Sequence, residues 1–156
     1  PANNAKTPTQ ASANPQIDTW IAARDRSLAE TLSVLGVDES VAQPSGYGNT
    51  MDLLRVYVPD THPARFYFKG SELVLIYLTP SATQEIDPVA TAEALGPPDA
   101  IVQSRSGKNY KHQIWASAGV AFSSRKSDIS FLEVFPPTTV EKWKAQFYEP
   151  VPLFRK

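Results

Sequence analysis

The chain has 156 residues, a formal net charge of −1 and a sequence pI near 6.2. That length suits one well-filled core or two fused half-domains, and the near-neutral charge provides no field to attract nucleic acid or an anionic membrane. The absence of cysteine excludes disulfides, thiolate nucleophiles and zinc–thiolate sites, and no apolar run approaches the roughly 18 residues of a membrane helix.

Residues 1–14 contain small and polar side chains with a single charge and no large apolar residue. This composition predicts a disordered tether. It fits either a frayed terminus or the spacer that follows a signal sequence or lipid anchor in an exported protein. Residues 150–156 are predicted to form an extended C-terminal tail.

Three helices are predicted. One apolar stripe runs from Asn14–Pro15, a typical helix start, to Gly36, a typical stop. A second, shorter helix is expected between Asp87–Pro88 and Gly96. The segment Thr138–Glu141 carries a capping-box pattern and predicts a C-terminal helix.

The sequence between the helices repeats itself, because residues 35–80 and 95–136 can be laid over one another. Each copy has a helix that closes on Leu-Gly, a polar loop with its own glycine, and then three strands of period two. This match places Tyr57 opposite Trp115 and Phe68 opposite Phe122. We therefore expect an α+β fold with two tandem helix-plus-antiparallel-three-strand repeats, helices packed on one sheet face, and a C-terminal helix. The expected units are residues 15–86 and 87–149.

The second copy carries Leu95-Gly96-Pro97-Pro98-Asp99, Trp115 in a strand, Gly119-Val120-Ala121-Phe122 and a closing strand that ends at Pro136. This pattern resembles the SmpA/OmlA (BamE) family of outer-membrane assembly lipoproteins and the wider beta-lactamase-inhibitor-protein-like repeat group. The resemblance covers residues 88–135, with residues 32–80 as a degraded second copy. It implies a cell-envelope location and a binding role through an uncovered sheet face. No lipidated cysteine is present, and single-repeat members of the family do not carry two copies.

Alternation in the strands assigns a set of aromatic, arginine and polar side chains to the outer sheet face, opposite the helices. The members of this predicted binding set are Arg55, Tyr57, Arg65, Tyr67, Tyr77, Gln113, Trp115, Phe131 and Glu133. Tyr, Trp and Arg dominate binding hot spots, so the set fits a partner surface. The alternative is that the chain itself covers these side chains, either between the two copies or under the terminal tails.

Catalytic and metal-binding patterns find little support in the sequence. His62 is expected in a turn, and His112 is interpreted as a solvated residue at the start of a strand, so no catalytic or metal site is predicted. Residues 104–108 resemble the end of a phosphate loop without its upstream glycine, and are interpreted as a basic loop. Basic hairpin tips at Lys69 and Arg125–Lys126 either solubilise the turns or contact an anionic partner.

The resulting hypothesis is a non-catalytic, exported cell-envelope protein that acts as an interaction or assembly factor. It is expected to need no cofactor, to bind a protein partner and no nucleic acid, and to allow tethering through its N-terminus. The runner-up is a small-ligand-binding or hydrolase-inhibitor-type module that uses the same sheet face. An enzyme ranks third.

Overall fold

The computed structural model describes residues 15–149, which form an α+β fold with four α-helices and one eight-stranded antiparallel sheet. The predicted tether at 1–14 and tail at 150–156 lie outside the described residues. The helices are α1 (Pro15–Ala23), α2 (Leu28–Leu35), α3 (Pro88–Leu95) and α4 (Val140–Phe147). The strands are β2 (Gln43–Tyr47), β3 (Thr50–Val58), β4 (His62–Lys69), β5 (Glu72–Leu78), β6 (Ala100–Gln103), β7 (Lys111–Trp115), β8 (Val120–Arg125) and β9 (Asp128–Val134). Short 3₁₀ turns occupy Glu39–Val41, Pro80–Ala82 and Ala116–Ala118.

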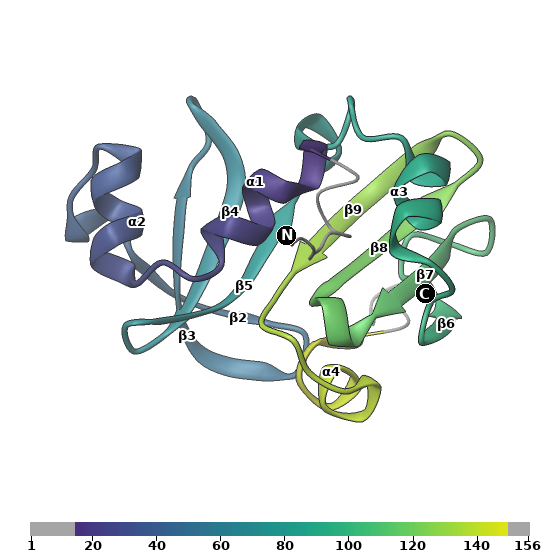
Figure 1. Ribbon diagram of the computed structural model, residues 1–156. Coiled ribbons are helices and arrows are strands. Elements are labelled where there is room, and N and C mark those ends of the chain that lie inside the picture. Colours follow the sequence, from purple (N-terminus) through teal and green to yellow (C-terminus); the bar gives the residue numbers. More distant parts are fainter. Residues whose placement is uncertain (1–14, 150–156) are drawn as a thin grey trace, which may run out of the picture.

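The sheet is built from two four-stranded meanders that meet at their last strands. Its order is β2-β3-β4-β5-β9-β8-β7-β6, so strands β2–β5 form a first unit, strands β6–β9 form a second unit, and β5 pairs with β9 (Figure 1). The expectation of three strands per unit is therefore wrong. The missed strands, β2 and β6, are short edge strands whose sequences QPSGY and AIVQ carry little alternation.

The two units are related by an approximate twofold axis that the strand pairing makes visible. In the first unit Phe66 pairs with Ile76 and Lys69 with Glu72. In the second unit Phe122 pairs with Leu132. In both hairpins the pairing register then shifts once between that pair and the turn. Phe66 is therefore the counterpart of Phe122, two residues before the Phe68 that the sequence repeat suggests. The two units share one continuous sheet rather than two separate layers.

Helices α1, α2 and α3 pack against one face of the sheet, which we call the helix face (Figure 1). The predicted single first helix is in fact two helices. Ser27 accepts a hydrogen bond from the Glu30 backbone N–H and the Glu30 carboxylate accepts one from the Ser27 N–H, so a capping box starts α2 anew. Gly36 then ends α2 with φ +72°, in the left-handed region that favours glycine.

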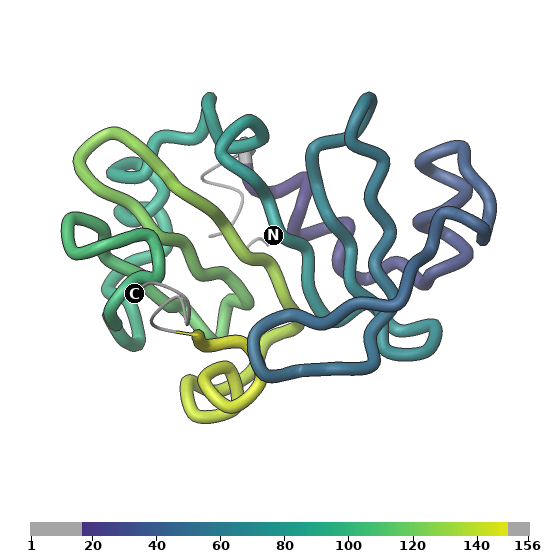
Figure 2. Tube along the Cα trace, turned by 180° about the vertical axis from the view of Figure 1, so that it is seen from behind, coloured from purple at the N-terminus to yellow at the C-terminus, as the bar shows by residue number. Residues whose placement is uncertain are grey.

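Helix α4, for which no sheet face was predicted, lies on the opposite face, which we call the outer face. Its start lies one residue after the one that the capping-box pattern predicts, because Thr139 and not Thr138 is the N-cap and its side chain accepts a hydrogen bond from the Lys142 backbone N–H. Trp143 and Phe147 are buried in a second core with Leu75 and Ile114. The tip of the β2–β3 hairpin reaches toward α4 across this face (Figure 2).

Candidate functional site

The outer face of the first unit carries four of the nine predicted binding residues in half-buried positions. They are Arg55, Tyr57, Arg65 and Tyr77. Pairing of Tyr57 with Arg65, and of Arg65 with Tyr77, aligns them across β3, β4 and β5. With Arg105, a half-buried residue of the β6–β7 loop, they form what we call the Arg–Tyr face.

The other five predicted residues do not form an exposed surface. Tyr67, Phe131 and Glu133 are on the outer face but buried, and the ring of Tyr47 lies 5.4 Å from that of Tyr67. Gln113 and Trp115 are on the helix face instead, because Gln113 pairs with Phe122 and Trp115 stacks on Phe122 in the main core. The predicted outer set is therefore wrong for β7.

The error in β7 comes from a slip of one residue. The sequence repeat matches Tyr57 with Trp115, whereas the strand pairing makes Tyr57 the counterpart of Ile114. A slip of one residue moves every side chain of a strand to the other face. Trp115 is 3% exposed, and its indole Nε1 donates to the Gly96 carbonyl at 2.8 Å, so it anchors the end of α3.

Rings and guanidinium groups alternate along the Arg–Tyr face. The Arg65 Cζ lies 4.7 Å from the centre of the Tyr57 ring and 5.5 Å from that of Tyr77. The Arg105 Cζ lies 5.9 Å from the Tyr77 ring centre and 4.1 Å from that of Phe131. Contacts of this kind hold each guanidinium against aromatic surface while its N–H donors, which lie in its plane, can still bind another group.

Arg55 and Arg65 of this face have no ion-pair partner in the described residues. The two ion pairs within 15–149 are His112–Glu133 and Arg125–Asp128, and neither involves the Arg–Tyr face. The buried Nε atoms of Arg55 and Arg65 make no hydrogen bond in this part of the chain. Residues 1–14 and 150–156 contain no Asp or Glu. Arg55 and Arg65 therefore present positive charge with no carboxylate side chain at ion-pair distance among residues 15–149.

A buried network fixes Arg105 beside the face. Its Nη2 donates to the Tyr47 hydroxyl at 2.9 Å, and that hydroxyl donates to Glu133 Oε2 at 2.5 Å. The other carboxylate oxygen, Oε1, lies 3.0 Å from His112 Nε2. Burial raises the pKa of Tyr47 well above its usual value, and the Glu133 charge adds to the increase, so Tyr47 stays protonated and donates. Desolvation lowers the pKa of Arg105, but Tyr47 and Glu133 outweigh it and leave that pKa raised.

His112 departs from its predicted role as a solvated residue. It is 2% exposed and packs edge-on against Phe131 and Trp143, at ring-centre distances of 5.0 and 4.9 Å. The pair with Glu133 does bring a histidine against a carboxylate, which is one element of a catalytic site. Because Glu133 is 0% exposed as well, the pair has no surface on which to meet a substrate. The pair links β7 to β9, and Glu133 also links β9 to the β2–β3 hairpin by accepting the hydrogen bond from Tyr47.

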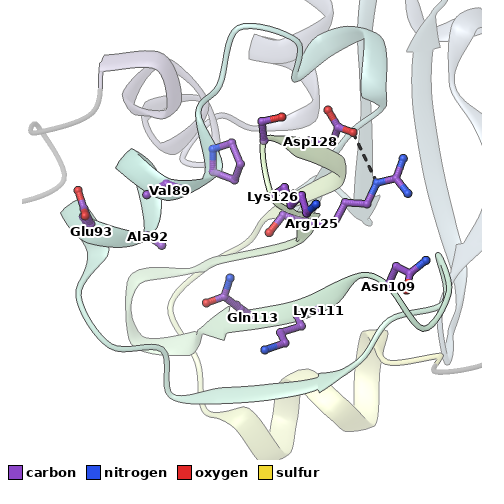
Figure 3. Close-up of a pocket in the computed structure, with 12 residues that line it drawn as sticks. Val89, Ala92, Glu93, Asn109, Lys111, Gln113, Arg125, Lys126 and Asp128 are labelled. Carbon is purple, nitrogen blue, oxygen red and sulfur yellow. Dashed lines mark ion pairs between the residues drawn. The ribbon is translucent and has the colours of Figure 1, made fainter.

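A second feature is an open groove of about 920 Å³ on the helix face, between α3, β7 and the β8–β9 turn (Figure 3). Its lining includes Lys111, Gln113 and Ser124 from the sheet and Lys126 from the turn. Sequence reasoning singled out the basic turn but gave no indication of the hollow beside it, because α3 is far from that turn along the chain.

No group of three potential metal ligands occurs among residues 15–149, and no helix in that range is long and apolar enough to span a bilayer. His62 is half-buried in β4, where its Nδ1 lies 2.7 Å from the Thr61 hydroxyl, rather than in a turn. Comparison with known proteins gives no family model, no curated relative and no solved structure that matches the chain.

Proposed function

We propose that this chain is a non-catalytic binding module that recognises an acidic segment of a protein partner through the Arg–Tyr face. The single observation that carries the proposal is the pair of half-buried arginines Arg55 and Arg65, which have no ion-pair partner among residues 15–149, with Arg65 held between aromatic rings. Asp and Glu side chains complement this face in charge, and guanidinium groups can bind carboxylates through two parallel hydrogen bonds.

The composition of the face supports a protein partner. Tyr and Arg are enriched at the centres of protein interfaces, where rigid side chains lose little freedom on binding. Arg65 is already held between Tyr57 and Tyr77, so a partner does not have to order it. The surface is a sheet that is half-covered by α4 and the β2–β3 tip, which suits an extended segment laid along the open strands.

We further propose that the protein is exported and acts at the cell envelope as an interaction or assembly factor. The support is the composition of residues 1–14, which suits a spacer behind a membrane anchor, together with the family resemblance of the second copy. Fractionation of producing cells tests this part alone. Recovery of the protein in the envelope fraction is expected, and recovery in the cytoplasm would contradict it.

The binding proposal is tested by affinity capture from native envelope extract with matched variants. Arg55→Gln/Arg65→Gln removes two charges from the face, and Lys108→Gln/Lys142→Gln removes two charges from exposed positions outside it. We expect the first variant to lose the partners that the wild type and the second variant retain, and the retained binding to weaken as salt is raised. Identical partner sets from both variants would count against the Arg–Tyr face.

A further inference from the structure

The groove on the helix face lies where the second unit departs most from the first. Strand pairing makes Lys111 and Ser124 the counterparts of Leu54 and Phe68, which face each other in the same way. By the same pairing Gln113 takes the place of Val56. The sheet therefore has polar side chains at three positions of the second unit where the first unit has apolar ones.

In the first unit these positions are closed. Val56 and Phe68 are 0% exposed, and Leu54 packs against the same core, which also includes Leu32 of α2. In the second unit the same backbone framework has polar residues at the sheet surface and remains open, with about 920 Å³ between α3 and the β8–β9 turn (Figure 3). The hollow is thus a core position of the duplicated scaffold that has become polar and accessible.

The walls of the groove differ in chemistry. Pro88, Val89 and Ala92 of α3 provide an apolar side, and the Val89 side chain is accessible there because it is 57% exposed (Figure 3). Lys111 on the sheet and Lys126 on the turn are the facing cations.

Arg125 and Asp128 also line the groove but satisfy each other, with a nitrogen–oxygen distance of 3.5 Å, and Arg125 lies over the Tyr110 ring. Lys111 and Lys126 have no ion-pair partner among residues 15–149. Glu93 is the remaining carboxylate, on α3 at the rim (Figure 3). The free charge inside the groove is therefore positive.

We propose that this groove binds a small amphiphilic carboxylate, with its apolar chain along α3 and its carboxylate between Lys111 and Lys126. The volume is within the range of small-molecule sites, and such sites combine apolar walls with a few polar groups that fix orientation. This inference is independent of the Arg–Tyr face, because the groove is on the helix face.

The test is an NMR titration of the ¹⁵N-labelled chain with three probes of equal chain length: hexanoate, hexylamine and hexanol. We expect hexanoate to shift the backbone amides of α3, β7 and the β8–β9 turn, and to bind about fivefold or more tightly than the other two probes. Equal or stronger binding of hexylamine, or hexanoate shifts confined to other parts of the molecule, would overturn the proposal.

Two variants sharpen the result. Lys111→Gln/Lys126→Gln should remove the preference for hexanoate over hexanol, whereas Lys108→Gln, which is outside the groove, should keep it. Gln113→Val/Ser124→Phe gives the second unit the residues of the first and should abolish hexanoate binding in a chain that still shows a dispersed spectrum. If the lysine pair variant keeps the full preference, the proposed carboxylate position is wrong whether or not the second variant folds.

Discussion

Tyr77 and Glu133 face each other across the β5–β9 pair, and each is the counterpart of the other in its own unit. The approximate twofold axis passes between them. At the centre of the sheet, β5 therefore carries an aromatic ring where β9 carries a buried carboxylate. The outer face has diverged around this point. The first unit presents Arg65 and Tyr57, while the second presents Ala121 and Ile114 beneath α4. The outer half of the first unit therefore keeps half-buried arginine and tyrosine side chains, whereas these positions of the second unit are buried under α4.

The Tyr47 hydroxyl should contribute a measurable part of the free energy of folding. Tyr47→Phe leaves Glu133 Oε2 without the hydrogen bond that Tyr47 donates and Arg105 without its acceptor, in a buried site. We expect the free energy of unfolding in urea to fall by about 1–3 kcal/mol. The matched control is Tyr57→Phe, at a half-buried ring with no hydroxyl hydrogen bond among residues 15–149, where a change within about 0.5 kcal/mol is expected. Equal losses would contradict the network.

Titration of the same hydroxyl should lower the stability of the fold at alkaline pH. Burial, with the nearby Glu133 charge, raises the pKa of Tyr47 above its usual value of 10.0 in the folded state. A raised folded pKa gives a stability contribution that is fully present below about pH 10 and is lost as the pH rises through the folded value. Urea midpoints measured from pH 8 upward should therefore fall more steeply above about pH 10 for the wild type than for Tyr47→Phe. Parallel curves would show that Tyr47 titrates normally.

Gly48 fixes the β2–β3 tip against α4. Its φ is +57°, and an added Cβ would lie 2.5 Å from the Phe147 carbonyl oxygen and 2.6 Å from its carbonyl carbon. Gly70 has a similar φ of +63° but nothing within 4 Å of an added Cβ, so it is the matched control. We expect Gly70→Ala to cost about 1–2 kcal/mol from backbone strain, and Gly48→Ala to cost at least about 1 kcal/mol more. Thermal unfolding of both variants gives the comparison, and similar losses would exclude the close approach.

Several elements could be predicted from the sequence because short-range chemistry defines them. Asp87 starts α3 as a side-chain cap, Thr139 starts α4 within one residue of the predicted capping box, and the glycine of each Leu-Gly pair ends a helix. The break between α1 and α2 was also readable, since Ser27 and Glu30 form a capping-box pattern, but the apolar stripe continues across it. The alternation of β7 was recognisable and its face was not, because the sequence match between the two copies is one residue away from the match that the strand pairing gives.

The parts of the site that sequence reasoning missed come from irregular segments. Arg105 lies in a loop and Tyr47 at the end of a short edge strand, where no periodicity assigns a face. Only the tertiary fold brings these two side chains together beside Glu133. The sequence pattern predicted that the outer face is rich in aromatic and arginine side chains. Long-range contacts determine which of these side chains stay accessible.

The most direct measurement is site-specific photocrosslinking in cells that produce the protein. A benzoylphenylalanine at position 57 replaces a half-buried ring of the Arg–Tyr face, and one at position 72 replaces an exposed residue of the β4–β5 hairpin, outside the face. We expect position 57 alone to crosslink to a protein segment containing several Asp or Glu residues, and Arg55→Gln/Arg65→Gln to abolish that product. Crosslinks of equal yield from both positions, or a product that persists without the arginines, would contradict the account.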